Sequence, residues 1–322
     1  MGITQTQIKQ RNIVVPILTT VLVIAALFLL NLLTGGKFLS VNNIMMIVQN
    51  ASAPTFIALG FVFLMASGFV DLSLGAAIIL SANVAGTFGN SIGYFGLIVS
   101  GIVSGVLLMA INFCIFQFTK IPSWIAGLGM TMIYEAIAFF YSEQRMNMGL
   151  RVVNLDDQTR ALGRAPLVYV VMAIGLLLAY FLYNRTTIGL DIRALGSNQD
   201  VASTMGIPMT KTVILSGIIT GIFVGIAAFV KESFAGTVPA VSGLASLSGT
   251  FQPLAAVLMA QALSKRVNIV FGAVIGTVFI MVVFNLLTLF GVPSGTWQET
   301  VLGLSVIVFG IIMQHNCRGV VK

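Results

Sequence analysis

Residues that could carry out chemistry are few and scattered in this chain. It holds 9 acidic residues, 1 histidine and 2 cysteines among 322 residues. His315 lies in the C-terminal tail, and Cys114 and Cys317 lack metal-ligand spacing and are too few for a disulfide framework. No HExxH motif, paired acids, Ser/His arrangement or GxxxxGK(S/T) phosphate loop appears. We therefore expect a chain that is not an enzyme and that binds no metal and no cofactor itself.

The composition predicts that the chain uses lipid as its solvent. Hydrophobic residues make up 58% and charged residues 8% of the sequence, whereas a soluble domain carries roughly 25% charged residues. Apolar stretches of helical rather than barrel-strand length recur along the chain. The apolar run Ile13–Leu33 is too long for the core of a signal peptide and has no small-residue cleavage site. The sequence thus predicts an all-α integral membrane protein that forms a single domain, residues 1–322.

Reading the apolar runs gives about ten transmembrane helices. They fall at Ile13–Leu33, Val41–Leu64, Leu72–Phe88, Tyr94–Phe118, Pro122–Tyr141, Leu167–Tyr183, Thr212–Val230, Phe251–Leu263, Val267–Phe290 and Glu299–Gln314. Two similar strings, Ser67–Ser73 and Ser242–Ser248, read Ser-Gly-apolar-x-x-Leu-Ser and precede the third and eighth spans. They are what two inversely related halves would leave in the sequence, although a chance echo explains them equally well.

Lysine and arginine residues indicate the orientation of these spans. An N-terminus inside the cell places ten basic residues in the cytoplasm: Lys9, Arg11, Lys120, Arg185, Arg193, Lys211, Lys265, Arg266, Arg318 and Lys322. Six lie outside: Lys37, Arg145, Arg151, Arg160, Arg164 and Lys231. The bias favours two cytoplasmic termini in a multi-pass protein. The net charge of +7 is then mainly a topology signal, and no basic face for nucleic acid appears.

Polar side chains within the apolar stretches are candidates to line a path through the membrane. Asp71 and Glu135 are the acids nearest the bilayer interior, where an ionisable residue is a functional candidate by default. The alternative for Asp71 is a helix cap, and the alternative for Glu135 is an ion pair with a basic residue of a partner span. Further candidates are Ser67, Ser73, Asn83, Asn112, Gln252 and Asn285. Interhelical hydrogen bonds would explain most such residues equally well.

The polar stretch Thr187–Lys211 lies between two spans on the predicted cytoplasmic side. Ser197 or Asn198 can cap a helix, Asp200 suits its first turn, and Gly206 followed by Ile207-Pro208 ends it. The pattern predicts about two turns of helix over Asn198–Met205, with Val201 and Met205 on one face. Such a short helix needs a docking partner, so it is either a coupling helix for a soluble protein or an incidental turn.

This stretch also carries a family resemblance. The residues Gly189, Ala194, Gly196, Asn198, Ala202, Gly206 and Ile207 fit the cytoplasmic loop of bacterial ABC importer permeases of the ribose/simple-sugar type. The segment Ser67–Gly75 resembles the family's SG-x-IDLSVG motif. Further matches are Asn112, Ile121–Ile125, Asn285–Val292 and Gln298. Together the matches cover most of the chain, from about Lys37 to the last span.

The resemblance implies a function and a set of partners. We expect a permease subunit of the bacterial cytoplasmic membrane with a ten-helix importer fold, moving a small polar solute, most simply a sugar or sugar-like molecule. Its partners would be ABC ATPase subunits that bind ATP and Mg, a second permease subunit and a soluble substrate-binding protein. The coupling loop, about residues 185–211, would contact the ATPase through Gly196, Asn198, Asp200, Val201, Ala202, Met205 and Gly206. Nucleoside or branched amino-acid import, and an ion-driven secondary transporter, are the alternatives.

Two departures from the family pattern indicate a specialised subunit. The glycine-rich segment expected after the eighth span is replaced by Met259–Asn268, which contains no glycine. Glu135 stands where relatives often carry arginine. Both departures favour a heterodimer whose other permease keeps the usual pattern, with a homodimer as the alternative.

Overall fold

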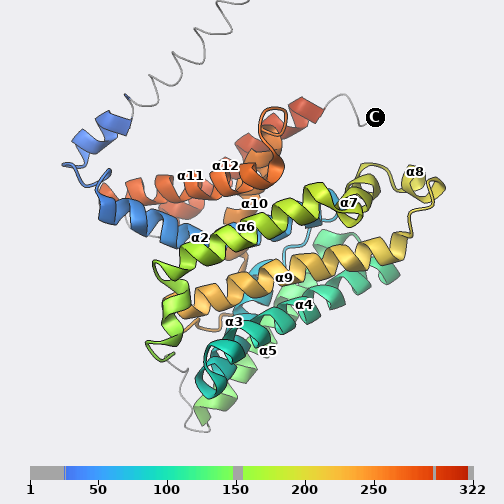
Figure 1. Ribbon diagram of the computed structural model, residues 1–322, viewed down its shortest axis with the longest axis horizontal. Helices are drawn as coiled ribbons and strands as arrows, with labels where there is room; N and C mark the ends of the chain where they lie inside the picture. Colours follow the sequence, from blue (N-terminus) through green and yellow to red (C-terminus); the bar gives the residue numbers. More distant parts are fainter. Residues whose placement is uncertain (1–24, 26, 148–154, 293–294, 318–322) are drawn as a thin grey trace, which may run out of the picture.

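The computed structural model describes residues 25, 27–147, 155–292 and 295–317, which form helices and no strand. The helices are α2 (Val41–Ala66), α3 (Leu74–Ile92), α4 (Tyr94–Thr119), α5 (Ser123–Asn147), the 3-10 helix η1 (Thr159–Gly163), α6 (Leu167–Arg185), α7 (Thr187–Ser197), α8 (Gln199–Thr204), α9 (Met209–Ala235), α10 (Leu247–Ala262), α11 (Ile269–Leu289) and α12 (Thr296–Cys317). The axes of the long helices are roughly aligned with one another, some helices running up and others down (Figure 1). η1 lies at one end of the bundle, and α7 and α8 lie at the other (Figure 1).

The predicted spans from Val41–Leu64 onward each match one helix, and the first, Ile13–Leu33, lies mostly outside the described residues. Seven of the helices are long and apolar enough to cross a membrane, namely α2, α4, α5, α6, α9, α11 and α12. The buried helices α3 and α10, of 19 and 16 residues, are not among them. The structure thus supports a multi-pass membrane protein, while the number ten stays a prediction.

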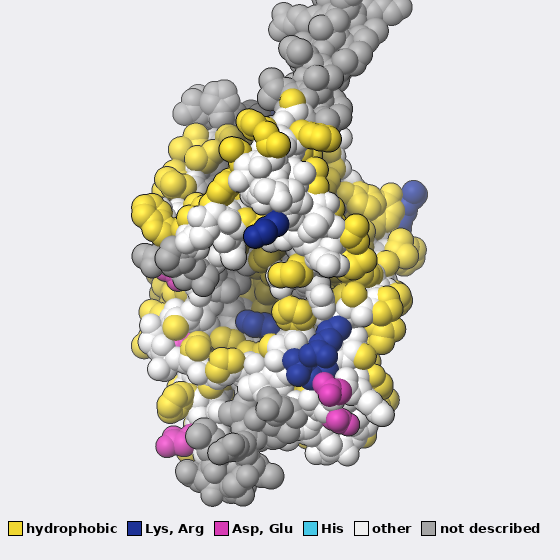
Figure 2. Space-filling model, turned by 90° about the vertical axis from the view of Figure 1, so that its left-hand side faces the viewer, with side chains coloured by type: hydrophobic (Ala, Val, Ile, Leu, Met, Phe, Trp, Pro, Cys, Tyr) yellow, Lys and Arg dark blue, Asp and Glu magenta, His cyan; other side chains and the backbone are white. Residues whose placement is uncertain are grey.

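The core forms around α2 and α9. Within their most apolar windows 72% of the residues are buried, against 6% in α12. Helices that are apolar all round therefore divide into a central pair and peripheral helices that present apolar side chains outward, as expected where lipid is the solvent. Figure 2 views the bundle from the end remote from α7 and α8. Hydrophobic side chains line both of its flanks, and basic side chains gather toward the middle.

Small residues allow α9 to pack closely against α4. A Cβ atom added to Gly217 would lie 2.6 Å from Phe113 Cγ, and one added to Gly221 would lie 2.6 Å from Val106 Cα. At Gly225 the same atom would lie 2.5 Å from the Gly101 carbonyl oxygen. These three glycines, spaced four residues apart on one face of α9, form a packing face, as their spacing predicts. It runs antiparallel along α4 and fixes α9 as a rigid central element.

Candidate functional site

The predicted cytoplasmic element is a pair of short helices, α7 and α8. Asn198 stands between them, and its Oδ1 accepts hydrogen bonds from the backbone N–H groups of Asp200 (3.0 Å) and Val201 (3.1 Å). Gly206 takes a φ of +82°, a conformation that favours glycine, and α8 ends just before it. The predicted cap and stop signals are confirmed.

The sequence prediction missed α7 as a separate helix. The Thr186 side chain caps it by accepting a hydrogen bond from Gly189 N at 3.2 Å, a threonine signal that the sequence contains. Ile192 and Leu195 are buried against the long helices. α7 therefore anchors the element to the bundle.

In contrast, α8 leaves apolar side chains uncovered. Ala202 is buried, but Val201 is 52% exposed and Met205 is 73% exposed. A helix of six residues does not stabilise itself in water. Its exposed apolar residues at the end of the bundle form a surface that a partner could cover.

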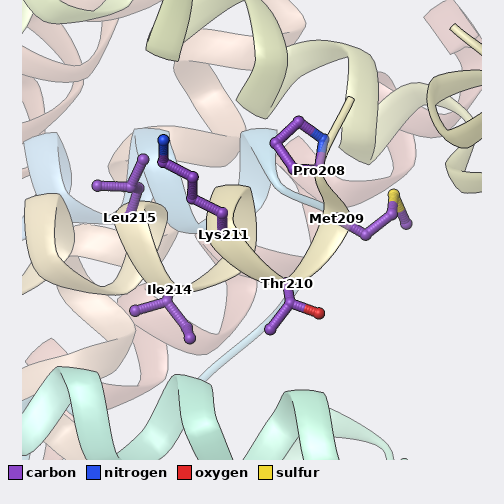
Figure 3. Close-up of a pocket in the computed structure, with 6 residues that line it drawn as sticks. All are labelled: Pro208, Met209, Thr210, Lys211, Ile214 and Leu215. Carbon is purple, nitrogen blue, oxygen red and sulfur yellow. The ribbon is translucent and has the colours of Figure 1, made fainter. Parts of the chain in front are cut away.

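A hollow of about 590 Å3 lies beside α8, where α9 begins (Figure 3). Its lining residues are Pro208, Met209, Thr210, Lys211, Ile214 and Leu215. Thr210 and Ile214 point toward α4, and Gln117 Nε2 of that helix donates a hydrogen bond to Thr210 Oγ1 at 3.2 Å. The first turns of α9 are therefore held against α4 through Thr210.

The end of α7 meets the break between α2 and α3 at close range. A Cβ atom on Gly196 would lie 2.0 Å from the Ala66 carbonyl oxygen, and one on Gly68 would lie 3.3 Å from Gly196 Cα. Gly68 has a φ of +84° in the break between α2 and α3. The two glycines let backbone meet backbone, so a displacement of α7 would be passed directly to this break.

Asp71 lies in that break, three residues before α3 begins at Leu74. Its Oδ1 accepts a hydrogen bond from Ser73 N at 2.8 Å, and the residue is fully buried. Asn112 Nδ2 of α4 donates to Asp71 Oδ2 (2.7 Å) and to Ser73 Oγ (2.5 Å). Ser73, not Asp71, is the N-cap residue of α3, so the Asp71 carboxylate bonds the residue before the helix and the helix-cap alternative is not confirmed. A direct contact of Asp71, Ser73 or Asn112 with solute stays a prediction.

Tyr134 completes this network, and the sequence analysis did not identify it. Its hydroxyl group donates to Asn112 Oδ1 at 2.7 Å and lies 2.8 Å from the Leu108 carbonyl oxygen. The ring is 2% exposed, so the hydroxyl group needs a partner inside the protein. Because an aromatic residue in an apolar span is common, no local pattern pointed to it.

Glu135, the next residue of α5, binds the backbone at the start of α10. Its carboxylate accepts hydrogen bonds from Leu244 N (2.8 Å) and Ser246 N (2.9 Å), and it is 3% exposed. Ser246 is the N-cap residue of α10. The partner is backbone rather than the cation that the sequence analysis considered, because unpaired N–H groups at a helix start attract a carboxylate.

The two helix starts also touch each other. Gly75 N of α3 donates to Thr250 Oγ1 of α10 at 2.9 Å, and Thr250 Oγ1 donates to the Leu72 carbonyl oxygen at 3.3 Å. A Cβ atom on Gly75 would lie only 2.1 Å from the Ser246 carbonyl oxygen. The starts of α3 and α10 are thus interlocked inside the bundle.

The other predicted path residues lie apart from this junction. Ser67 Oγ donates to the Leu64 carbonyl oxygen of its own helix at 2.7 Å, and Asn83 Nδ2 donates to the Ile79 carbonyl oxygen at 2.8 Å. Asn285 forms a reciprocal amide pair with Asn43, at 2.9 and 2.8 Å, that joins α11 to α2. Gln252 Nε2 is buried without a hydrogen-bond partner among the described residues. A path role stays a prediction for each.

The described residues contain no group of three or more His, Cys, Asp or Glu side chains that could hold a metal ion. The predicted tail residues His315 and Cys317 lie where side chains are not described. The acids that are buried have hydrogen-bond partners in the backbone or in Asn112. The arrangement is therefore one of helix caps and helix contacts.

Comparison with known proteins decides the family. Residues 43–313 match the family described as "Branched-chain amino acid transport system / permease component". The chain belongs to this permease family.

Several curated relatives align over most of the permease. It is 26% identical to the fructose import permease protein FrcC of Rhizobium meliloti, over 91% of this chain and 83% of the relative. It is 26% identical to the D-allose transport system permease protein AlsC of Escherichia coli K12, over 84% and 83%. It is 29% identical to the autoinducer 2 import system permease protein LsrC of Enterobacter sp. strain 638, over 92% and 85%. No solved structure matches.

Proposed function

We propose that this permease is the membrane subunit of an ATP-driven ABC importer for a sugar or sugar-like solute. The relatives with similar sequences import fructose, D-allose and autoinducer 2, and none of those named is a branched amino-acid permease. Family membership supports the transport role, and the relatives' names support the class of cargo. Nucleoside and branched amino-acid import are therefore less well supported.

The observation that carries the coupling mechanism is the path from α8 to the α2–α3 break. The exposed side chains of Val201 and Met205 suit a groove on an ATPase subunit. α7 is anchored in the bundle, and Gly196 meets Ala66 and Gly68 without intervening side chains. When the ATPase pair closes on ATP and Mg, the α7–α8 element, within residues 185–211, would move and shift the start of α3.

The remaining assembly follows from the family. The importer would hold two ATPase subunits, this chain as a single permease domain, a second permease and a soluble substrate-binding protein. The lack of glycine in Met259–Asn268 and the glutamate at position 135, where relatives often carry arginine, favour a different chain as the second permease. Both termini would be cytoplasmic in the bacterial inner membrane, and the two halves, each containing an interlocked helix start, would be inversely related.

The test is uptake by the complete importer in membrane vesicles, with radiolabelled D-fructose, D-allose and D-ribose as probes. Asn198→Pro combined with Gly206→Val should abolish ATP-driven uptake. Proline cannot adopt the φ of −162° at Asn198, and valine is strained at the positive φ of Gly206. Membrane insertion should be unchanged.

The matched control is Gln199→Pro. Gln199 is the first residue of α8, where proline is tolerated, and Asn198 before it already has an extended backbone. Uptake by this variant should resemble the unmodified importer. Normal uptake by the double variant, or transport by the purified chain alone on an ion gradient, would contradict ATPase coupling. The latter result would favour a secondary transporter.

A further inference from the structure

A groove of about 610 Å3 lies between the start of α10 and the first half of α12, at the edge of the bundle (Figure 1). One wall comes from residues between Leu244 and Phe251, and the other comes from residues between Glu299 and Ile307. Small-molecule sites have volumes of roughly 300–1,000 Å3. The groove therefore has room for a solute of monosaccharide size.

The wall at the start of α10 is irregular backbone at the depth of the bundle centre. Glu135 lies at the middle of the 25-residue helix α5 and accepts hydrogen bonds from Leu244 N and Ser246 N. These bonds place the segment before α10 beside the middle of a helix that is long and apolar enough to cross a membrane. Leu244 has a φ of +65°, a conformation that is uncommon for residues other than glycine and that clusters at functional sites.

The same segment is exposed rather than covered by the bundle. Its exposed residues are Ser242, Gly243, Ala245, Ser248 and Gly249. A Cβ atom added to Gly243 or Gly249 would meet no atom within 4 Å. Lipid cannot bond polar backbone groups, so irregular backbone at membrane depth occurs only where protein buries it or where it lines a water-filled cavity. Because the described part of this chain does not bury the segment, a water-filled groove is favoured.

The side chains that line the groove suit a neutral sugar. Ser248 Oγ donates a hydrogen bond to the Ala245 carbonyl oxygen at 3.0 Å, which leaves its lone pairs for a solute hydroxyl group. Glu299 is exposed, and its carboxylate has no ion pair within the described residues. A carboxylate accepts strong hydrogen bonds from hydroxyl groups. Phe251 is 37% exposed and offers an apolar ring face, and none of the lining residues is basic.

We propose that the groove between α10 and α12 binds a neutral, hydroxyl-rich solute on its way across the membrane. Ser248 and Glu299 bond to solute hydroxyl groups, and Phe251 covers the apolar face of the solute. The proposal rests on the proposed function, and it assigns where the cargo contacts this chain. Glu135 acts as a positioning residue, because it fixes the backbone of the wall without lining the groove.

The first experiment tests whether the groove holds water. Ser248→Cys, in a chain with Cys114→Ala and Cys317→Ala, should react with a charged methanethiosulfonate reagent in membrane fragments that contain the complete importer. The matched control is Leu107→Cys, since Leu107 is 56% exposed on the regular helix α4, where lipid should cover it. If Ser248→Cys were as unreactive as this control, lipid or a second permease would cover the groove, and the site would be overturned.

The same reaction tests contact with the cargo. Among D-fructose, D-allose and D-ribose, the sugar that the importer transports best should slow the reaction of Ser248→Cys at least about threefold at concentrations well above KM. The sugar that is transported worst should protect least. Reaction without protection by any of them would overturn the site. Uptake of none of the three sugars would contradict the proposed function, while the reactivity of Ser248→Cys would still decide whether the groove is water-filled.

A second experiment measures KM for the sugar that is transported best. Glu299→Ala removes a charged acceptor and should raise KM about 10- to 100-fold, whereas Glu299→Gln keeps one acceptor oxygen and should raise it less. The matched control is Glu143→Ala, because Glu143 is an exposed acid that does not line the groove. Its KM should be unchanged. An unchanged KM for Glu299→Ala, or an equal rise in both alanine variants, would overturn the contact between Glu299 and the solute.

Discussion

α3 and α10 both follow a Ser-Gly-apolar-x-x-Leu-Ser string, Ser67–Ser73 and Ser242–Ser248, yet their first turns are held in different ways. In the first string the Asp71 carboxylate accepts a hydrogen bond from the N–H group of Ser73, the N-cap residue of α3, two residues later. The second has no acid, and Glu135 reaches it from α5, 111 residues away from Ser246 in the chain.

The helices also begin at different places in the two strings. α3 starts after the seventh residue, Ser73, whereas α10 starts at the sixth, Leu247, with Ser246 as its N-cap. The break before α3 meets Gly196 of α7, at Ala66 and Gly68, whereas the start of α10 lines a cavity of about 340 Å3. Similar sequences therefore give one start held by a nearby acid with Asn112 and Thr250, and one held by a carboxylate from a distant helix.

The largest expected effect comes from removing the long-range cap. Glu135→Ala leaves the buried N–H groups of Leu244 and Ser246 without an acceptor. It should lower the free energy of unfolding by about 3 kcal/mol. The midpoint of thermal unfolding in detergent measures this change. Glu135→Gln keeps one acceptor oxygen and should do less harm, whereas Glu143→Ala, at an exposed position, should have little effect.

The hydrogen-bond network before α3 is tested at Asn112, which bonds Asp71 and Ser73. Asn112→Ala removes the amide group that bonds Asp71, Ser73 and Tyr134, and it should cost about 2 kcal/mol. The matched control is Asn83→Ala, since the Nδ2 of that buried residue donates to a carbonyl group of its own helix. The same unfolding measurement applies. Equal shifts for both variants would show that the network does not stabilise the start of α3.

A change at Gly196 tests whether movement of α7 is transmitted to the break between α2 and α3. Gly196→Ala places a Cβ atom 2.0 Å from the Ala66 carbonyl oxygen, so α7 must move away from the break. Uptake should fall about tenfold, equivalent to about 1.4 kcal/mol, while ATP hydrolysis continues. Gly129→Ala, with no atom within 4 Å of the added Cβ, is the control. Full uptake by Gly196→Ala would argue against transmission through this contact.

The smallest effect is expected for Tyr134→Phe. The change removes only the hydroxyl group that contacts Leu108 and Asn112, and it should lower the unfolding free energy by about 1 kcal/mol. Tyr180→Phe is the control, because no hydrogen bond of the Tyr180 hydroxyl group occurs within the described residues. Combined with Asn112→Ala, the loss should be less than the sum of the two single losses.

The sequence by itself determined the solvent, the positions of the long helices and the signals that begin and end the short helix α8. These features depend on local composition and on neighbouring residues, as at Asn198, where the side chain caps the next two N–H groups. The bond between the Asp71 carboxylate and Ser73 N, two residues apart, was within reach for the same reason. The motifs of the α7–α8 loop also indicated the family, which residues 43–313 confirm.

Only the tertiary structure decided what the isolated polar residues do. Glu135, Tyr134 and Asn285 find partners in other parts of the bundle, and a cavity of about 340 Å3 beside Ser246 exists only where α2, α3, α9 and α10 meet. In an apolar bundle each buried polar group must find a partner inside the protein. Which partner it finds depends on helix packing between residues 22 to 242 positions apart in the chain, and no local pattern encodes that choice.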